Sequence, residues 1–519
     1  MNFKWLKRSR VIVSLLIFLC IFFIFIDIYE LIPHRVTDTV LYPQFIPSLL
    51  LFLKTISFTS LGFIFIILLS AFFGRIYCST ICPLGIFQDI ISYISKKISH
   101  RKVHYKFKKP HSIFRYSILT IVTVTILAGI PFLITILDPY SIAGRFFTYL
   151  IKPVVIFINN IIAGVANKME WYTIYKIKVY TVPLTILLLN IAFIVTIGYL
   201  AYKRGRLFCN TVCPVGTFLG LFSKYSLFKI NIHNDKCTKC ANCASVCKSE
   251  CIDLKNSSID YSRCVSCYNC LTVCNDDAID FKKIKPAKVT SHSRTRRNVI
   301  AGLFLLTGST LIKAQNIKPE KKSKTGKTLK PVKRNSPTSP PGSKNIERFN
   351  NICTGCGLCV SACPTKVLRP AFTEYGLMGF MQPHMDYSVG ECNFDCTICG
   401  DICPTGAILP VTKDEKHLLQ LGKAKFVKEN CIVYTDETAC GACSEHCPTK
   451  AVNMVPYKGK LLIPKVDESI CVGCGSCEHP CPLEHDYKAI YVDGNPEHLK
   501  ADKPKEEKAV EIPEEDFPF

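Results

Sequence analysis

The chain has 519 residues, too many for one domain, and it carries 30 cysteines and a formal net charge of +24. Most of the cysteines fall in close-set groups of four, a pattern that argues against a secreted disulfide scaffold. The positive charge is weak evidence for a nucleic-acid partner, because much of it lies in loops beside apolar segments, where basic residues set membrane orientation.

The domain expected at residues 1–230 is mostly apolar and predicts an α-helical membrane bundle. Four spans are expected, at 11–28, in a segment that ends at Phe73, at about 113–137 and at about 180–202. Basic residues follow the second and fourth spans, so the positive-inside rule places the loops after both in the cytoplasm. Residues 154–166, between the third and fourth spans, are expected along the outer membrane interface.

A twelve-residue motif occurs twice in this domain, as GRIYCSTICPLG at 74–85 and as GRLFCNTVCPVG at 205–216. Each copy places two cysteines four residues apart, on one face of a helical turn at the end of an apolar helix. The repeat therefore predicts that four thiols meet at one membrane surface, namely Cys78, Cys82, Cys209 and Cys213. Four thiolates suit an iron–sulfur cluster or a zinc ion, two pairs can cycle as dithiol and disulfide, and a duplicated helix end that only shapes a turn is the plainest alternative.

Two runs of four cysteines define the next predicted domain, residues 231–285. Their spacing is that of two-cluster ferredoxins, in which the fourth cysteine of each run binds the other [4Fe-4S] cluster. The predicted ligand sets are Cys237, Cys240 and Cys243 with Cys274, and Cys264, Cys267 and Cys270 with Cys247. Cys251 is close enough in sequence to compete as a fourth ligand, and a zinc ribbon is the weaker alternative.

Residues 286–316 resemble a twin-arginine export signal. About fourteen apolar residues follow Arg296 and Arg297, which is short for an ordinary span and typical of a signal h-region. Because a poor cleavage site follows, we expect a fifth, signal-anchor segment; a basic linker beside an interfacial helix is the alternative. Residues 317–345 are rich in Lys, Pro, Ser and Thr and are predicted to form a flexible linker.

Four more tetrads, each closing on Cys-Pro, predict a four-cluster ferredoxin domain at residues 346–500. They are Cys353, Cys356, Cys359 and Cys363; Cys392, Cys396, Cys399 and Cys403; Cys431, Cys440, Cys443 and Cys447; and Cys471, Cys474, Cys477 and Cys481. Pseudo-symmetric nesting predicts that the first tetrad pairs with the fourth and the second with the third. Residues 501–519 form a charged tail that is expected to be solvated.

The two Gly-Arg-x-aromatic-Cys-x-x-x-Cys-Pro motifs on a four-span bundle, followed by a two-cluster ferredoxin, resemble NapH-type membrane subunits, whose core NosR and CcoG-type proteins share. The twin-arginine segment with four further tetrads resembles NapG, their exported ferredoxin partner. The chain is thus similar to a fusion of the two subunits. This resemblance implies a quinol dehydrogenase component of the bacterial inner membrane that takes electrons from menaquinol or a related quinol and passes them to a periplasmic reductase or cytochrome.

The predicted function is therefore iron–sulfur electron transfer, in an α-helical bundle of four spans plus a signal-anchor, joined to α+β ferredoxin-like domains. Six [4Fe-4S] clusters are expected at the tetrads, with a further metal or cluster at the Cys-x-x-x-Cys-Pro cysteines. The expected partners are membrane lipid, the quinone pool and an exported acceptor, and no nucleic acid. The alternatives are a maturation factor that reduces a metal or disulfide for a respiratory enzyme, and a structural zinc scaffold.

The expected topology puts the 231–285 domain in the cytoplasm and the 346–500 domain in the periplasm, on either side of the signal-anchor. Acidic and imidazole side chains at the predicted outer helix ends are candidate proton acceptors for quinol oxidation, and interfacial anchoring explains them equally well. These residues are Asp27, Glu30, His34 and Asp138. Cys20, inside the first span, has no predicted role.

Overall fold

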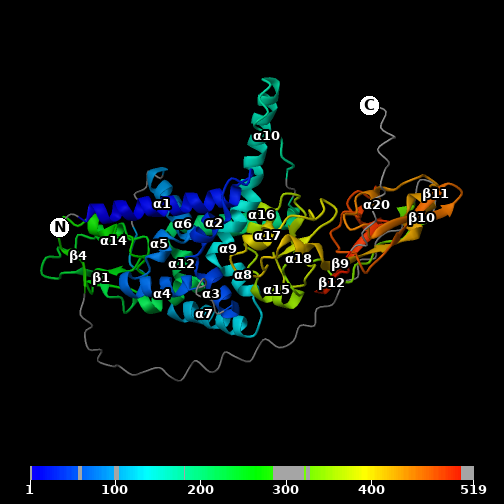
Figure 1. The fold of residues 1–519 in the computed structure, drawn as a ribbon. Helices are drawn as coiled ribbons and strands as arrows, with labels where there is room; N and C mark the ends of the chain where they lie inside the picture. The colour runs from blue at the N-terminus through cyan, green and yellow to red at the C-terminus, as the bar shows by residue number, and fades with distance from the viewer. Residues whose placement is uncertain are drawn as a thin grey trace.

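The computed structural model describes residues 3–55, 61–98, 105–179, 182–283, 321–322 and 328–503. They form an elongated molecule with a helical bundle between three cysteine-rich units (Figure 1). We call residues 228–283 the first unit, at one end of the bundle, and residues 346–410 and 419–500 the second and third units, at the other. The predicted signal-anchor at 286–316 and the tail from residue 504 onward lie outside the described residues.

The bundle is built from the first 223 residues. Its helices are α1 (Lys4–Ile26), α2 (His34–Leu41), α3 (Phe45–Thr55), α4 (Gly62–Phe73), α5 (Tyr77–Thr80), α6 (Pro83–Ile98), α7 (Ser112–Leu127), α8 (Phe132–Leu137), α9 (Pro139–Phe146), the π-helix η2 (Phe147–Ile151), α10 (Lys152–Lys168), α11 (Leu184–Arg204), α12 (Leu207–Thr211) and α13 (Pro214–Ser223). Phe25 and Leu219 are fully buried in its core, which also takes in Val265 of the first unit and Leu358 of the second. The bundle and the two adjoining units therefore share one hydrophobic core.

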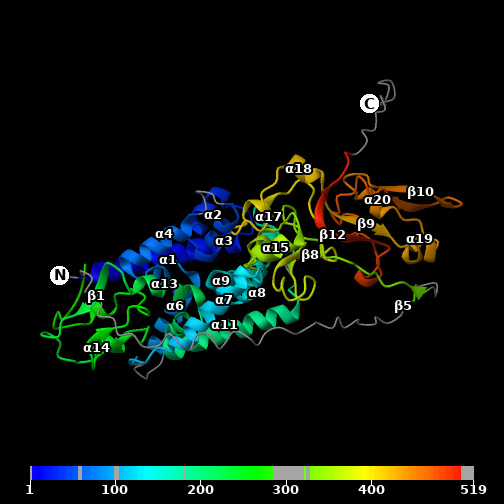
Figure 2. The same cartoon turned by 90° about the horizontal axis from the view of Figure 1, so that it is seen from below.

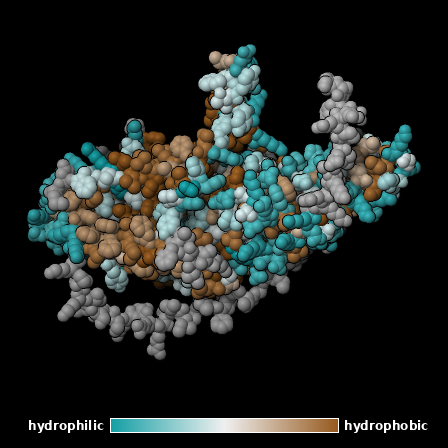
Figure 3. Space-filling model, in the orientation of Figure 1, coloured by the Kyte–Doolittle hydropathy of each residue, from teal (hydrophilic) through white to brown (hydrophobic). Residues whose placement is uncertain are grey.

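After two basic turns, helix α1 is apolar on nearly every side from Val11 onward, which is typical of a helix that contacts lipid as well as protein. Its 23 residues rise about 34 Å at 1.5 Å per residue, enough to cross the hydrocarbon core of a bilayer. Ile21 and Phe25 are buried against the bundle, whereas Leu16 and Leu19 are exposed. Figure 3 shows the resulting apolar surface over the bundle, bordered by hydrophilic surface on the units at both ends.

Three helices of the described chain are long and apolar enough to span a membrane: Lys4–Ile26, Pro139–Lys168 and Leu184–Arg204. They include the first and fourth predicted spans. The second predicted span is replaced by α4, of 12 residues, and by the α2–α3 pair, which is bent by 98° and counts as a fourth span only if taken as one. The third predicted span is split into α7 and α8, because Gly129 has a left-handed φ of 72° and Pro131 cannot continue a helix.

Residues 139–168 form one apolar helix with a π-helical turn in its middle. Its outer part, α10, stands crosswise to α1 (Figure 1), whereas α11 runs in the same general direction as α1 (Figure 2). Residues 154–166, expected at the outer interface, lie in α10. A helix that runs crosswise to the spans would lie in the membrane plane, as a helix at the interface does. The interfacial position of this segment stays a prediction.

The first unit consists of two small antiparallel sheets that enclose the cysteine runs. β1 (Phe228–Ile232) pairs with β4 (Ile279–Lys283), and β2 (Ile252–Asp253) pairs with β3 (Ser258–Ile259). The third cysteine of each run lies in a short helix, α14 (Asn242–Ser245) or η3 (Cys270–Thr272). The Phe228 ring stacks on Phe73 at the end of α4, with 5.4 Å between ring centroids, so the sheet is joined directly to the bundle.

The second and third units follow each other along the chain. The second contains α15 (Ile346–Ile352), α16 (Leu358–Ala362), β7 (Leu368–Pro370), β8 (Pro383–Met385) and α17 (Ile398–Asp401). After α18 (Lys413–His417), the third contains β9 (Leu419–Phe426), η4 (Lys428–Asn430), α19 (Ile432–Thr435), α20 (Ala442–Glu445), β10 (Val452–Lys458), β11 (Leu461–Val466), η5 (His485–Tyr487) and β12 (Ile490–Lys500). β7 pairs with β8, β9 with β12 and β10 with β11, all antiparallel. Leu421 and Val492 of the third unit pack into the core of the second.

Residues 328–345 were expected in a flexible linker, but they pack along the second and third units. This strap begins at β6 (Thr328–Leu329), which pairs with β5 (Lys321–Lys322). The Asn335 N–H donates to an Asp493 carboxylate oxygen at 2.8 Å, and an Arg334 guanidinium nitrogen lies 2.5 Å from Glu478. The composition indicated little apolar burial, but polar side chains order this segment instead. The linker prediction is therefore corrected from residue 328 onward.

Candidate metal centres

The two Cys-Pro motifs follow helices that end in the same way. α4 stops at Gly74 and α11 at Gly205, with φ values of 77° and 63°, a conformation that favours glycine. Each glycine leads through an arginine into a short helix, α5 or α12, that carries the first cysteine of the pair. Pro83 and Pro214 then start α6 and α13, because the first turn of a helix does not need the missing N–H.

The four motif cysteines converge in the core of the bundle. They are Cys78, Cys82, Cys209 and Cys213, and each is at most 4% exposed. Burial, followed by the neighbouring thiols of the other three cysteines, raises the pKa of Cys82. The structure thus brings together the four sulfur atoms that the repeat places at one surface. A motif that only shaped two helix ends would not require its sulfur atoms to meet.

Each copy of the motif is held by the arginine of the other copy. Arg75 Nη2 donates to the Cys209 carbonyl at 3.0 Å, and Arg206 Nη1 donates to the Cys78 carbonyl at 2.5 Å. Both guanidinium groups are fully buried. The two copies of the motif are therefore also related in the structure by an approximate two-fold, and each copy is held in position by the arginine of the other.

The glycine that closes each motif makes room for this exchange. A Cβ atom on Gly85 would lie 2.7 Å from Arg206 Nη1, and one on Gly216 would lie 2.5 Å from Arg75 Nη2. Either side chain would push the buried arginine away from its carbonyl partner. The repeat in the sequence marks these glycines, but only the fold shows why the motif needs them.

Polar side chains also reach the motif sulfur atoms. Gln88 Nε2 lies 3.2 Å from Cys209 Sγ, and Arg75 Nη2 lies 3.8 Å from Cys78 Sγ. Donors directed at sulfur stabilise the thiolate form and tune the potential of a bound cluster. Gln88 was not among the predicted site residues. Its position in the second turn of the helix that starts at Cys-Pro is the signal that would have found it.

Asp89 joins four parts of the molecule at one carboxylate. It lies 2.9 Å from Arg206 Nε, 3.3 Å from Lys248 Nζ of the first unit and 3.4 Å from Arg10 Nη1 of α1. Burial opposes ionisation, but the charges of Arg206 and Lys248 outweigh it and hold the pKa of Asp89 well below its usual range. Sequence reasoning missed this residue because its partners lie far apart in the chain.

The first unit gathers its eight run cysteines into two sets of four. One set is Cys237, Cys240, Cys243 and Cys274, and the other is Cys247, Cys264, Cys267 and Cys270. These are the sets that the spacing predicts, with the fourth cysteine exchanged between runs. Burial raises the pKa of Cys243 to about 11, and its three neighbouring thiols add to the shift.

Cys251 lies beside the second of these sets. It is 1% exposed, and its Sγ lies 3.5 Å from Cys247 Sγ. It also shares a hydrogen bond with Cys264. Its competition for the fourth ligand position therefore stays a prediction. Cys20, by contrast, is exposed on α1.

In the second and third units, cysteines group within each unit. The sets are Cys353, Cys356, Cys359 with Cys403; Cys392, Cys396, Cys399 with Cys363; Cys431, Cys440, Cys443 with Cys481; and Cys471, Cys474, Cys477 with Cys447. The predicted nesting of first with fourth tetrad, and of second with third, is wrong. Adjacent tetrads exchange their fourth cysteine because elements close in the chain, such as α16 and α17, pack against each other.

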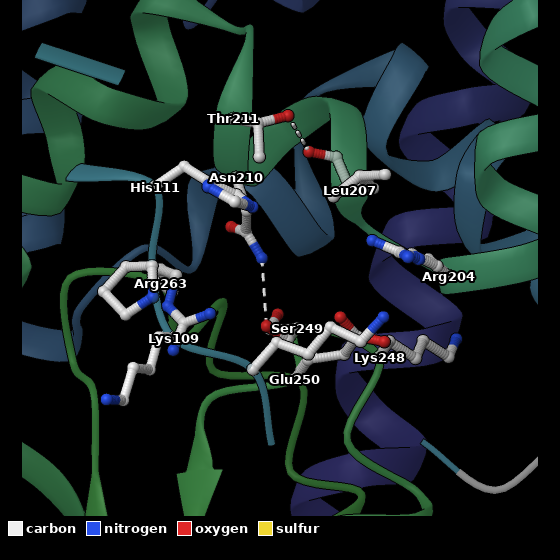
Figure 4. Close-up of a pocket in the computed structure, with 12 residues that line it drawn as sticks. Lys109, His111, Arg204, Leu207, Asn210, Thr211, Lys248, Ser249, Glu250 and Arg263 are labelled. Carbon is white, nitrogen blue, oxygen red and sulfur yellow. Dashed lines mark hydrogen bonds between the residues drawn. The ribbon is translucent and has the colours of Figure 1, made fainter. Parts of the chain in front are cut away.

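A small basic cavity lies between the second motif and the first unit (Figure 4). Asn210 Nδ2 donates across it to the Ser249 carbonyl at 3.2 Å. Arg204, Lys248 and Arg263 line it, and its volume of about 30 Å³ leaves room for about one water molecule. These cations lie where neighbouring sets of thiolates would accumulate negative charge.

We call the four motif cysteines the four-thiol site. Buried aromatic side chains connect this site to the second unit. Tyr77 lies beside the motif thiols and Asp138, and Tyr140 lies beside Asp138 and Cys356. Both tyrosines are 1% exposed. The contact is tight, because a Cβ atom on Gly144 of α9 would lie 2.4 Å from the Cys356 carbonyl oxygen.

Lys152 attaches the second unit to the far end of α1. Its Nζ donates to the Ser361 carbonyl at 2.9 Å and to the Asp27 carbonyl at 2.8 Å. The Ser361 hydroxyl in turn donates to the Phe25 carbonyl. The second unit is thus bound at the opposite end of α1 from the first.

The acidic residues predicted as outer proton acceptors serve mainly as helix and turn caps. Asp27 accepts hydrogen bonds from two backbone N–H groups that follow it, and Asp138 accepts from the N–H and hydroxyl of Ser141 at the start of α9. Glu30 and His34 are exposed. Capping accounts for the two aspartates without a role in proton transfer.

Each thiol set offers the four thiolates that a [4Fe-4S] cluster needs. A zinc ion with bonds of about 2.3 Å needs its sulfur atoms about 3.8 Å apart. Within the described parts of the chain, no group of three or more His, Cys, Asp or Glu side chains closes in this way around one metal ion. A cavity is lined by Cys431, Cys440, Cys443 and Cys481, and burial raises the pKa of Cys443 to about 12. A cationic iron core between the sulfur atoms would stabilise the thiolates.

Three family matches cover the cysteine-rich regions. Residues 56–102 and 184–233, with both Cys-Pro motifs, match a family described as "4Fe-4S binding domain". Residues 352–407 and 438–484 match a "4Fe-4S dicluster domain", and residues 260–367 match a second family of that description. The last match joins runs that the structure holds at opposite ends of the bundle, so it reflects cysteine spacing rather than one folded unit. The matches support several [4Fe-4S] clusters.

Curated relatives match part of the chain. The methylamine utilization ferredoxin-type protein MauM of Methylophilus methylotrophus is 37% identical over 166 residues, which are 30% of this chain and 70% of MauM. The ferredoxin-type protein NapG of Escherichia coli is 33% identical over 159 residues, 28% of this chain and 66% of NapG. NapF of the same organism is 26% identical over 144 residues, 28% of this chain and 79% of NapF. No solved structure gives a significant match.

Proposed function

We propose, from the premise that this chain belongs to the family of ferredoxin-type iron–sulfur proteins that includes MauM and NapG, that it carries electrons from a membrane quinol to an acceptor outside the membrane. Iron–sulfur electron transfer follows from the family itself. The membrane route, the quinol donor and the exported acceptor make up the proposal.

The observation that carries it is the placement of thiol sets at both ends of α1. Phe3 and Leu6, at the start of α1, pack against the first unit, and Phe25, at its end, accepts a hydrogen bond from the second. At 1.5 Å per residue these contacts are separated by about 28 to 33 Å along α1, close to the hydrocarbon thickness of about 30 Å. The proposal therefore places the bilayer between redox-capable groups that one chain connects.

The three units would hold six [4Fe-4S] clusters, one for each set of four cysteines, and the four motif cysteines would hold a further metal or cluster. When bound, such clusters supply one-electron redox steps. The chain's own side chains fix the order of the sites. Arg75 and Asn210 bind the four-thiol site to the first unit, Lys152 binds the bundle to the second unit, and Asn335 binds the strap to the third.

This arrangement supports a fusion of a NapH-like part, residues 1–285, with a NapG-like part, residues 346–500. The NapH-like part contains a 1–230 bundle and the 231–285 ferredoxin, and the four-thiol site joins them. The NapG-like part meets the bundle through a separate interface around α16, as a docked partner subunit would.

We place the protein in the bacterial inner membrane, with the first unit cytoplasmic and the second and third periplasmic. Protease added to intact spheroplasts should remove the units after residue 345 and spare the first. Protection of all three until lysis would contradict the export. Changing Arg296 and Arg297 to lysine should trap the second and third units inside if the segment acts as a twin-arginine signal.

Metal analysis tests the cofactors directly. Six clusters correspond to about 24 iron atoms per chain, with any iron at the four-thiol site added to that number. Anaerobically purified protein should contain matching sulfide. Stoichiometric zinc with little sulfide would contradict the proposal.

Internal relay accounts for the four-thiol site better than a role in maturation. A maturation factor that reduces a client needs thiols within reach of that client. The four motif cysteines are at most 4% exposed. Quinol-driven cluster reduction in membranes, with candidate reductases added in turn, would distinguish sustained electron transfer from a maturation role.

A further inference from the structure

A large cavity lies where α1, α6 and the first unit meet. Its volume is about 580 Å³, within the range of sites for ring-shaped cofactors. Its lining is mostly apolar, and includes Val11 and Leu15 of α1 and Ile90 and Tyr93 of α6. Leu15 is 43% exposed and Tyr93 is 67% exposed. The cavity therefore opens through apolar side chains at the surface that we propose faces lipid.

Charged side chains from three elements line the other end of the cavity. They are Lys7, Arg10, Asp89, Lys96 and Lys248. Arg10 is 93% buried, since only 7% of it is exposed, and its Nε atom has no hydrogen-bond partner among the described residues. The charged end therefore offers an oxygen atom inside the cavity cationic donors from α1, α6 and the first unit.

This charged end touches residues next to the thiol sets of the first unit. Val246 and Lys248 flank Cys247, and Val273 precedes Cys274. Each of the two sets therefore has a member whose chain neighbour forms the cavity wall. A ligand held here would lie beside both candidate clusters.

We infer that this cavity binds the ring of a quinol, with one ring oxygen at the charged end, near Lys7, Arg10 and Lys248, and the isoprenoid tail leaving between Leu15 and Tyr93. The inference rests on the proposed function and names the site of that substrate. Oxidation of one quinol to quinone breaks two O–H bonds, releases two protons to water at the charged end, and gives two electrons to the two oxidised clusters of the first unit, one to each. The lysines favour the anion that forms when the first proton leaves.

A phospholipid phosphate would also be attracted to these lysines, but the geometry favours a quinol. A headgroup binds to a basic patch at the membrane surface, whereas these lysines lie at the charged end of a ring-sized cavity that also has apolar side chains from α1 and α6 in its wall. Its position next to both thiol sets is also useful only to a redox ligand.

The test uses the full chain, purified anaerobically and placed in lipid nanodiscs. An azido-naphthoquinone should photolabel residues 7–15 or 86–96, as peptide mapping would show. Leu15→Trp should lower both the labelling and the rate of cluster reduction by a one-isoprenyl naphthoquinol about tenfold, a loss of ~1.4 kcal/mol. Dithionite should still reduce the variant's clusters fully, because Leu15 is exposed and its replacement does not disturb the core.

Thr39→Trp is the matched control. It places the same large ring in the cavity beside Cys403, at the other end of the bundle, and should change neither labelling nor rate. Normal labelling and rate in Leu15→Trp, or losses confined to Thr39→Trp, would overturn the inference. Displacement of the label by phosphatidylglycerol but not by excess naphthoquinone would assign the cavity to lipid instead. If residues 7–15 are labelled in a wild-type protein whose clusters quinol cannot reduce, the binding site would be supported and the proposed function would be contradicted.

Discussion

The first and second units attach thiol sets to the same bundle by different chemistry. At the first unit the contacts are buried and charged: Arg75 donates to the Ser262 carbonyl at 3.1 Å, and Asp89 lies 3.3 Å from Lys248. At the second unit they are mostly apolar and neutral, with Leu358 in the bundle core and Gly144 packed on the Cys356 loop.

This difference in contacts means that the first unit is coupled to the four-thiol site through shared charges, whereas the second unit is docked on the bundle. Arg75 holds both the four-thiol site and the first unit, so a change of charge in one is felt in the other through one guanidinium group. The second unit is held through Lys152, whose described hydrogen bonds go to neutral groups of Ser361 and Asp27, and it continues into the third unit, away from the helices (Figure 1). In the proposed function, the first unit would thus act as part of a redox centre in the bundle, and the other two units would form a path that leads away from it.

The largest effect is expected from variants at the four-thiol site, which in the proposed path connects the first unit to the second. Cys82→Ser and Cys213→Ser should each stop quinol-driven reduction of the second and third units while the first unit is still reduced, because the joint site needs both copies of the motif. Electron paramagnetic resonance of the separate clusters would measure this. Cys20→Ser, at an exposed site on α1, is the control and should behave as wild type. Loss in only one of the two motif variants would show that the copies are independent.

The next effect concerns stability and should appear at the first unit. Asp89→Asn leaves Arg10, Arg206 and Lys248 without their counter-charge, so the free energy of unfolding should fall by roughly 3–5 kcal/mol. Denaturant unfolding of the detergent-solubilised protein would measure the loss. Glu437→Gln removes the partner of Lys458, at an exposed ion pair of the third unit, and should have no measurable effect. Equal losses in the two variants would remove the contrast between buried and exposed charge.

At the second unit a smaller effect is expected. Lys152→Met removes the hydrogen bonds to the carbonyls of Ser361 and Asp27, which should weaken the interface by about 1–3 kcal/mol. Hydrogen exchange in residues 357–363 should then speed up, with no change in residues 262–270. Lys168→Met, at the exposed end of α10, serves as the matched control. Faster exchange in the first unit as well would mean that the two attachments are not separable.

The sequence predicted what depends on short spacing. The cysteine sets of the first unit and the meeting of the four motif cysteines follow from local repeats, and the structure places them together. The pairing of the later tetrads did not follow, because it depends on which packed elements meet. The pseudo-symmetric nesting expected from the sequence did not predict which tetrads pair.

Polar contacts between residues far apart in the chain could not be predicted from the sequence either, because they too depend on which elements pack together. Asp89 and Gln88 lie on an ordinary-looking helix, and their importance comes from Arg206 and Cys209, more than 100 residues away. The strap at 328–345 looked disordered because its composition is polar. Its partners, Asp493 and Glu478, lie on elements far along the chain. The broken third span was readable in principle, since Gly129 and Pro131 are in the sequence.

The smallest expected effect is a dependence on pH in the strap that holds the second and third units together. Ser339 of the strap lies 2.8 Å from His498 Nε2 on β12. Burial lowers the pKa of His498 to about 4. In the unfolded chain the imidazole has an ordinary pKa of about 6.5, so the unfolded state binds a proton first as the pH falls. Stability should therefore be unaffected by His498 above pH 7 and should fall from about pH 6.5 down to about pH 4.

Between pH 7 and pH 5.5, this linkage amounts to about 1 kcal/mol of unfolding free energy. Denaturant unfolding at the two pH values would measure it in the wild type, and the difference should shrink by about that amount in His498→Gln, which cannot be protonated in this range. The first unit provides the comparison, because its attachment does not involve His498: fluorescence or exchange probes placed there should show the same pH response in both proteins. An identical response of the second and third units in wild type and variant would mean that His498 is protonated as easily in the folded strap as in water, and that the strap does not enclose it.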